Sequence, residues 1–422
     1  MMKKLLAVVL TVAMVISMAA CNKGTKGQTI EVAHLYTGDS LEAFKVLVEK
    51  FTEETGIKVN LSDSGDDYEA MMKTRMASNK LPDVFQTHGW SIIRYKEYLM
   101  KLNDQSWFKD LDESALGVIS DEDGSVYVLI ISELINGTLV NIDVCEAAGV
   151  DYTQIHTWDD FTAACEKIKA AGYTPLGVNP NPGVLANYAG TWTTYKGAYA
   201  EDGEAQLNGT WDWKSYGESC LKQHAEWVSA GYYYEDAPTM ADTDLSERFA
   251  ANKAAFINGN DPGVFVKAKT YNPDGRYAFM PSFASADGAE EFVGIGEGDT
   301  FGIWKDTKHE EAAKAFLEFM ARPENAIAIN NITAKISCLK STMAIDESDG
   351  LAYFKEMKET CKNCNIRYEN LWDRKYMPSG MWSIFGNACG MLFDDPSEAG
   401  QAAVLDYLKT NYDDLYAAAQ NK

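Results

Sequence analysis

The sequence predicts an α/β fold divided between two domains. The first observation is an alternation, beginning near residue 29, of short strand-like segments with longer segments of helical periodicity. The order strand, helix, strand, helix, strand is typical of a parallel sheet covered by helices. The second observation is length, because the roughly 400 residues after the N-terminal segment exceed what one hydrophobic core usually supports.

The N-terminal part of the chain shows this alternation most clearly. Residues Thr29–Leu35 alternate apolar and polar side chains as a strand does, and Leu41–Thr55 has the apolar spacing of an amphipathic helix that Gly56 ends. The expected elements that follow are a strand at Ile57–Leu61, a helix at Tyr68–Ser78, and strands at Asp83–Thr87, Val126–Ile131 and Thr138–Asn141.

Regular patterns continue on both sides of a middle region, residues 180–240. This region is rich in aromatic residues, and we expect it to be irregular. Within it, Trp211 and Trp213 follow a turn at Asn208-Gly209 and are interpreted as part of a structural hairpin. The remaining expected elements are helices at Val144–Gly149, Asp159–Ala171, Glu310–Ala321 and Ala399–Asn411, and strands at Pro175–Val178, Ala254–Ile257, Phe292–Ile295 and Thr300–Trp304.

The first 20 residues have the pattern of a secretory signal. Lys3 and Lys4 precede an uncharged apolar run that ends in Ala19-Ala20, directly before Cys21. A cysteine at this place resembles the point at which bacterial lipoproteins are cut and acylated, although an ordinary signal with a chance cysteine remains an alternative. We therefore expect a signal peptide at 1–20, a polar tether at 21–28, and a lipid anchor at Cys21 on the outer face of the cytoplasmic membrane.

The charge of the chain excludes one broad class of partner. The formal net charge is −24, and removal of Lys3 and Lys4 with the signal would take it to −26. Nucleic acid binding needs clusters of Lys and Arg, so this acidic balance argues against it. We expect a monomer whose partners are a small molecule, a membrane permease and the membrane itself through the lipid anchor.

Motifs for metal binding, cofactor binding and catalysis are absent from the sequence. Besides Cys21 there are seven cysteines, an odd number, and Cys361 and Cys364 have a CxxC spacing that no second pair or nearby histidine completes. The five histidines lie far apart, and neither a GxSxG elbow nor a phosphate-binding glycine loop occurs. The sequence therefore predicts no cofactor and no metal, and the missing catalytic motifs argue against an enzyme.

Several segments together resemble family 1 extracellular solute-binding lipoproteins of ABC importers, which include maltose-type and oligosaccharide-binding proteins. The resemblance runs from about residue 29 to the C-terminus, and the order of its markers is more specific than any one of them. These markers are Phe51-Thr-Glu-Glu-Thr-Gly56, Leu81-Pro82-Asp83-Val84-Phe85, Thr138-Leu-Val-Asn141, Thr157-Trp158-Asp159-Asp160-Phe161, Asn252-Lys-Ala-Ala-Phe256-Ile-Asn-Gly259, and Gly302-Ile-Trp-Lys305 with the helix after it.

The resemblance implies a periplasmic-binding-protein-like fold of type II, in which two lobes close on a solute around crossing strands. With that template, lobe 1 comprises residues 29–133 and 293–338, and lobe 2 comprises residues 134–292 and 339–422. The crossings are expected near Glu133–Gly137, Phe292–Glu297 and Ile336–Lys340.

The same template nominates the ligand-binding residues, which lie in loops and crossing strands. Sugars offer apolar faces that stack on aromatic rings, and hydroxyls that pair with carboxylates and amides. Gly89-Trp90 stands where maltose-type relatives have an Asp-Arg pair, which argues against maltodextrin, and Asn260-Asp261 replaces the usual Pro-Trp. The nominated residues are Tyr36, Asp39, His88, Trp90, Glu133, Trp192, Asn260, Asp261, Glu297, Asp299, Tyr376 and Trp382.

Three classes of function remain after these observations. The resemblance favours a binding protein that captures a carbohydrate, in particular an oligosaccharide, between two lobes and delivers it to an importer. A secreted glycoside hydrolase is an alternative, because its paired carboxylates meet in space rather than in sequence. A carbohydrate-binding adhesin or scaffold is the third.

Overall fold

The chain forms two compact α/β units, each with its own sheet. The computed structural model describes residues 24–420 except 63–67, 88–94, 122, 179–184, 186–188, 191, 193–197, 241, 260–261, 282–290, 334, 348, 361–364 and 369–371. Unit 1 contains the residues up to Ser132 together with 298–333 and 337–346, and unit 2 contains 133–297, 334–336 and 347 onwards. The predicted α/β class with two lobes is confirmed.

The sheet of unit 1 is mixed, and its order shows a crossover. Its strands, in spatial order, are β2 (Lys58–Ser62), β1 (Thr29–Ala33), β3 (Val84–Gln86), β10 (Thr300–Ile303) and β4 (Val128–Ile130). The first three strands are parallel, as the sequence predicts, whereas β10 is antiparallel to both of its neighbours. A strand from late in the chain therefore lies inside a sheet built from the first part of the chain.

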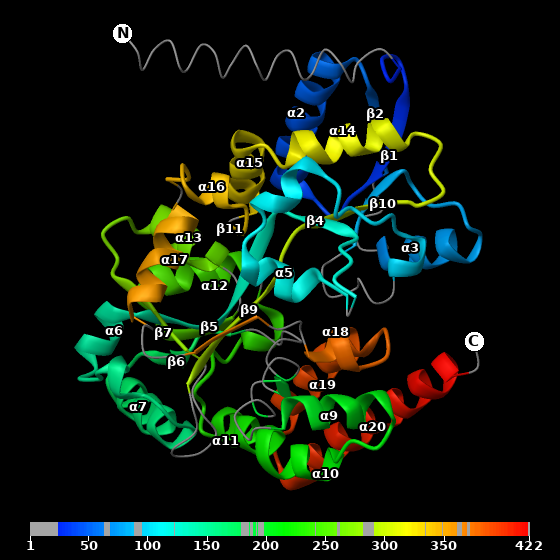
Figure 1. Ribbon diagram of the computed structural model, residues 1–422. Helices are drawn as coiled ribbons and strands as arrows, with labels where there is room; N and C mark the ends of the chain where they lie inside the picture. Colours follow the sequence, from blue (N-terminus) through cyan, green and yellow to red (C-terminus); the bar gives the residue numbers. More distant parts are fainter. Residues whose placement is uncertain are drawn as a thin grey trace. The chain divides into compact units, whose positions relative to one another are not determined.

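Helices of unit 1 pack against strands of this sheet, and aromatic side chains join two of these helices to each other. They are α2 (Gly38–Thr55), α3 (Tyr68–Ala77), α5 (Glu113–Ile119), α14 (Glu310–Met320), α15 (Pro323–Thr333) and α16 (Lys340–Met343). Phe51 of α2 contacts Phe316 and Phe319 of α14, with ring centroids 5.1 and 5.4 Å apart, and the two helices lie together in Figure 1. Gly56 ends α2 at a left-handed φ of 72°, which is the stop that the sequence predicts.

The sheet of unit 2 is organised around one long strand, β5 (Ser132–Asn141). Residues Glu133–Asn136 of this strand pair with β9, and its second half pairs with β7 and β8, all antiparallel. The other strands are β6 (Thr174–Leu176), β7 (Ala254–Gly259), β8 (Tyr277–Met280), β9 (Phe292–Glu297), β11 (Ile336–Ser337) and β12 (Asn365–Tyr368).

Helices make up most of the rest of unit 2. They are α6 (Ile142–Ala147), α7 (Trp158–Ala170), α9 (Tyr199–Leu207), α10 (Trp213–Tyr216), α11 (Lys222–Ser229), α12 (Asp242–Ala250), α13 (Pro262–Tyr271), α17 (Asp349–Thr360), α18 (Trp372–Tyr376), α19 (Met381–Asp394) and α20 (Glu398–Gln420). The prediction that residues 180–240 are irregular is wrong for α9 to α11. Trp211 lies in the connection between α9 and α10, and Trp213 is the first residue of α10, so the predicted hairpin is wrong as well.

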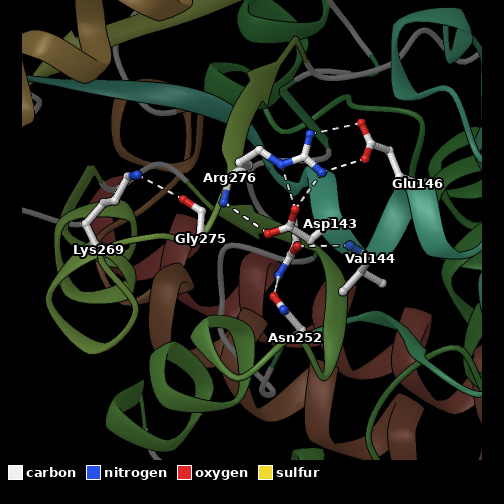
Figure 2. A network of polar contacts seen from close by, with 8 residues as sticks. Asp143, Val144, Glu146, Asn252, Lys269, Gly275 and Arg276 are labelled. Atoms are coloured by element: carbon white, nitrogen blue, oxygen red, sulfur yellow. Dashed lines mark hydrogen bonds and ion pairs between the residues drawn. The ribbon is translucent and has the colours of Figure 1, made fainter.

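Two of the family markers meet at the C-terminal end of β5. The side chain of Asn141 accepts a hydrogen bond from Val144 N at 3.1 Å and so caps α6. Its amide nitrogen donates to Asn252 Oδ1 at 2.8 Å, and Asn252 has a left-handed φ of 56°. Figure 2 shows Asn252 and Val144 beside an ion-pair network in which Arg276 binds both Asp143 and Glu146. These markers therefore have a structural role.

The bounds of the two units differ by a few residues from those of the expected lobes. Residues 339–346 were assigned to lobe 2 but belong to unit 1, because Leu339 bridges to Leu111 and Ser341 N donates to Asp110 Oδ1 at 2.9 Å. Residues 293–297 were assigned to lobe 1 but belong to unit 2, because they form β9 with its partners β5 and β12. The hinge motion stays a prediction.

Candidate functional site

Unit 1 contains a buried polar cluster, which we define as Tyr36, Gln86, Ser132 and Asp299. Asp299 lies in the connection from β9 to β10, and its carboxylate accepts hydrogen bonds from Gln86 Nε2 at 3.1 Å and from Ser132 Oγ at 3.0 Å. Ser132 Oγ in turn accepts from Asp299 N at 2.8 Å. Asp299 is only 5% exposed, so these bonds hold a carboxylate in a fixed orientation within a largely water-free environment.

The strands of unit 1 position the other members of the polar cluster. Gln86 is the last residue of β3, and its Oε1 accepts from Leu35 N at 2.5 Å, just after β1 ends. Tyr36 is the next residue and is buried. Its burial and the nearby charge of Asp299 raise the pKa of Tyr36 well above its ordinary value, so the phenol stays protonated. The cluster therefore combines a carboxylate, an amide and hydroxyl groups.

Gly298 allows the polar cluster to form. Its N–H donates to Ser132 O at 2.8 Å, and a Cβ at this position would lie 2.5 Å from Ser132 Oγ and 2.8 Å from Ser132 O. One of these atoms is backbone, which cannot move aside as a flexible side chain can. A glycine between Glu297 and Asp299 is thus required by close approach of the two chain segments.

Unit 2 contains a second buried acidic feature, the carboxyl pair Glu133 and Glu297. These residues lie directly opposite one another on the antiparallel strands β5 and β9, and they are 4% and 3% exposed. Burial raises the pKa of Glu297 to about 8; a backbone hydrogen bond and Lys375 oppose this rise, and Glu133 adds to it. Sequence alone nominates both residues but gives no sign that they are paired.

Unit 2 also contains an aromatic cluster, which comprises Trp192, Trp211, Trp213, Tyr216, Trp372 and Tyr376. Ring centroids lie 6.4 Å apart for Trp192 and Trp211, 6.2 Å for Trp211 and Trp372, and 4.9 Å for Trp372 and Tyr376. The close packing of α9 on α18 depends on Gly203, where a Cβ would lie 2.5 Å from Tyr376 Cε1. All six residues are buried members of the core of unit 2.

Trp382 differs from the aromatic cluster in its exposure. It is the second residue of α19 and is partly buried, packed against the same core. A ring that is only partly covered by its own unit keeps apolar surface on which a sugar face can stack. Within unit 2, Trp382 is therefore the predicted aromatic residue whose burial best suits a ligand contact.

The nominated residues fall into distinct groups in the structure. Tyr36 and Asp299 come together in unit 1, Glu133 and Glu297 form the carboxyl pair of unit 2, and Trp192 and Tyr376 join its aromatic cluster. The side chain of Asp39 is not described, although its backbone lies in the first turn of α2. The remaining nominated residues, His88, Trp90, Asn260, Asp261 and the lipidation candidate Cys21, lie outside the described residues.

Sequence reasoning missed several residues that the structure places at these features. Gln86 and Ser132 are not among the nominated residues, although the structure places them at the end of β3 and at the start of β5. Trp372 and Lys375 were not nominated. Their signal is weak, because α18 has only five residues, too few to show a helical period.

The described residues were also compared with the requirements for metal binding and for crossing a membrane. Within the part of the chain that the structure describes, no three His, Cys, Asp or Glu residues are grouped so that they could hold a metal ion. Over the same residues, no helix combines the length and apolar character needed to cross a bilayer. Cys361 and Cys364 lie outside this part, and the described cysteines are buried; burial raises the pKa of the Cys145 thiol to about 12.

Two α/β units, with buried carboxylates on the strands that connect them along the chain, define the class of bacterial solute-binding proteins. A sequence profile of the bacterial extracellular solute-binding proteins matches residues 37–327, and the chain belongs to this family. The melibiose/raffinose/stachyose-binding protein MelE of Bacillus subtilis is 30% identical over 417 residues, which cover 94% of this chain and 93% of that protein.

Solved structures agree with this assignment. A binding protein of Bacillus subtilis in an open conformation has a TM-score of 0.81 and 27% identity, with 94% of this chain and 99% of that chain covered. A sugar transporter protein of Bacillus licheniformis in complex with stachyose has a TM-score of 0.77 and 28% identity, with 92% of this chain and 100% of that chain covered. The prediction of a family 1 extracellular solute-binding protein is confirmed.

Proposed function

We propose that this chain is the extracellular binding component of an ABC importer and that it captures a galactose-containing oligosaccharide. The observation that carries the proposal is similarity over nearly the whole chain to a melibiose/raffinose/stachyose-binding protein, together with the likeness to a stachyose complex. Melibiose, raffinose and stachyose share a terminal galactose linked through O6 of the next sugar. That shared terminal unit is the ligand chemistry that we assign to the site.

The site chemistry supports a polyhydroxylated ligand in preference to an apolar or a charged one. The polar cluster offers an oriented carboxylate in unit 1, and the carboxyl pair offers two more oxygen-rich groups in unit 2. Trp90 and Trp382 are the proposed stacking platforms, and His88, Asn260 and Asp261 are the proposed further polar contacts. Each stacked ring and each paired hydroxyl adds to orientation as well as to affinity.

Isothermal titration calorimetry with a panel of sugars tests the proposal. We expect stachyose, raffinose and melibiose to bind, and maltotriose and sucrose, which lack the terminal galactose, to bind at least tenfold more weakly. A ligand at 100 times its Kd also stabilises the protein by about 2.7 kcal/mol, which a thermal melting curve detects independently. Equal affinity for maltotriose and raffinose would show that the galactose assignment is wrong.

The same incubations separate a binding protein from a glycoside hydrolase. A binding component returns the sugar unchanged, so chromatography after long incubation with stachyose should show no galactose and no shorter product. Released galactose at a rate proportional to protein concentration would favour the hydrolase alternative. Binding without products, and without any effect of the protein on cell attachment, argues against both alternatives.

We extend the proposal to a lipid anchor at Cys21. The apolar run that ends in Ala19-Ala20 before Cys21 motivates it. Replacing the thiol by a hydroxyl in Cys21→Ser removes the acylation site, so we expect a labelled fatty acid to attach to the wild type alone. Equal label on both proteins would place the anchor elsewhere.

A further inference from the structure

The chain contains three Asn-Gly sequences, and the structure gives them different surroundings. They are Asn136-Gly137, Asn208-Gly209 and Asn258-Gly259. In such a sequence the glycine nitrogen can attack the asparagine side chain, because glycine has no Cβ to hinder the approach. The reaction needs no enzyme, but it needs an asparagine whose backbone can rotate and whose side chain water can reach. The fold around each sequence therefore determines which of them reacts.

Two of the three sequences lie in central strands of the sheet of unit 2. Asn136-Gly137 belongs to β5 and Asn258-Gly259 to β7, and these two strands pair with each other inside that sheet. A Cβ on Gly137 would lie 1.9 Å from Phe279 Cζ, so this backbone is tightly covered. Rotation of either asparagine requires paired strands of the sheet to open, and opening of core strands costs up to the whole free energy of unfolding.

The third sequence lies in an exposed turn at the end of α9. Asn208 is the C-cap residue, Gly209 follows it with a left-handed φ of 71°, and both residues are exposed. Gly209 N donates to Gln206 O at 3.3 Å, which is longer than a usual hydrogen bond, and Thr210 N donates to Ala205 O at 2.8 Å. Rotation at Asn208 opens these bonds at a helix end, where the free energy of local opening is low.

We propose that Asn208 is a site of spontaneous deamidation, at which the chain acquires a negative charge and an altered turn. The nitrogen of Gly209 loses its proton to the solvent and forms a bond to Cγ of Asn208, and the Cγ–Nδ2 bond breaks with release of ammonia. The product is a five-membered cyclic imide. Water then cleaves the imide at Cγ, which leaves aspartate, or at the main-chain carbonyl carbon, which leaves isoaspartate. The net change is the exchange of NH for O.

The modification has two physical consequences. Both products place a negative charge at the C-terminal end of α9, where the helix dipole is already negative, and the formal net charge of the chain goes from −24 to −25. Isoaspartate also lengthens the main chain by one carbon atom. The turn packs against α20, because Tyr412 Oη donates to Gln206 O and a Cβ on Gly209 would lie 3.1 Å from Tyr416 Cε1. We therefore expect weaker packing between α9 and α20.

Peptide mapping by mass spectrometry tests the assignment to one site. The folded protein is incubated for several days in a mildly alkaline buffer, because the attacking nitrogen must lose its proton. We expect the exchange of NH for O to be at least tenfold faster at Asn208 than at Asn136 or Asn258, since a difference of about 1.4 kcal/mol in the free energy of opening gives this factor. Equal rates at the three sequences, or faster exchange in β5 or β7, would overturn the proposal.

A matched variant connects the modification to this asparagine. In Asn208→Gln the attack would have to close a six-membered ring, which forms far more slowly, while the exposed amide is kept. Ion-exchange chromatography of the incubated wild type should show an acidic species that incubated Asn208→Gln lacks. An acidic species that persists in Asn208→Gln at the wild-type level would assign the added charge to another residue and would overturn the proposal.

Melting curves test the effect on the turn between α9 and α20. We expect incubated wild type to melt about 2–4 °C below fresh protein, which is the shift that a modest local loss causes in a domain of this size. Incubated Asn208→Gln should melt as its fresh form does, and Asn208→Asp shows the effect of the charge without the longer main chain. Fully modified wild type that melts like fresh protein would overturn the predicted loss of packing. None of these measurements uses a ligand, so the inference is independent of the proposed function.

Discussion

The polar cluster of unit 1 and the aromatic cluster of unit 2 lie on different kinds of element. In unit 1 the polar cluster lies at the ends of strands, so strand register and backbone hydrogen bonds fix the positions of Gln86, Ser132 and Asp299. In unit 2 the members of the aromatic cluster other than Trp211 lie in helical segments, and their rings contact one another. Hydrogen bonds need precise distances and angles, which strands supply, whereas stacking tolerates small shifts of a helix.

The number of aromatic residues in the sequence does not show how many of them contact a ligand. Ten tryptophans in the sequence suggest a sugar-binding surface, but Trp192, Trp211, Trp213 and Trp372 are buried together in the core of unit 2. Trp382 is only partly covered by the same core. Substitutions that distinguish stability from binding therefore test which rings serve the fold and which serve the ligand.

The largest effect is expected for Trp211→Ala, at the centre of the aromatic cluster. Its ring contacts those of Trp192, Trp213, Tyr216 and Trp372, and the side chain is buried. Removal of a buried tryptophan typically costs about 3–5 kcal/mol in the free energy of unfolding. Calorimetric melting should therefore show a lower transition for unit 2. A loss below about 1 kcal/mol would contradict the core assignment.

An intermediate effect is expected for Asp299→Ala in unit 1. This change leaves Gln86 Nε2 and Ser132 Oγ without their buried acceptor, and hydrogen bonds to a charged group contribute about 1.5–3 kcal/mol each. We expect a loss of about 2–4 kcal/mol in the unfolding free energy of unit 1, together with weaker sugar binding. Asp274→Ala is the control, because Asp274 is an exposed turn residue of unit 2. A melting curve like that of the control would show that the polar cluster adds no stability.

The smallest effect on stability, paired with a clear effect on binding, is expected for Trp382→Ala. A partly covered ring contributes less to the core than Trp211 does, so the apo melting temperature should fall less. Loss of a stacking platform should weaken stachyose binding at least tenfold, which requires only about 1.4 kcal/mol. Titration calorimetry beside apo melting curves measures both quantities. Intact affinity, or a collapse of the apo protein, would make the platform assignment wrong.

The first part of the fold could be predicted because its local signals agree with one another. The strand and helix patterns of residues 29–87 match β1, α2, β2, α3 and β3 to within a few residues, and Gly56 lies at the predicted end of α2. Residues 199–229 were missed because their helices are short, with only four residues in α10. One of their turns is also a π-helix, at Gly217–Leu221, which breaks the 3.6-residue period.

The candidate site could be predicted in its residue types but not in its contacts. The resemblance nominated Glu133, Glu297 and Asp299, and the structure places all three in buried positions. Pairing of Glu133 with Glu297, and of Ser132 with Asp299, depends on the register between segments far apart in sequence. No periodicity within one segment carries that information, so such contacts emerge only from the folded chain.

The place of β10 in the sheet of unit 1 has a consequence for biosynthesis. The ribosome makes β1 to β4 early, but β10, which separates β3 from β4, follows only after β5 to β9 of unit 2. Until then the facing edges of β3 and β4 lack their partner, and such edges attract other chains. Domains usually fold in the order in which they emerge, whereas here the first sheet stays open until most of the second has been synthesised. The sheet of unit 1 therefore receives its full set of strands only once Thr300–Ile303 have been synthesised.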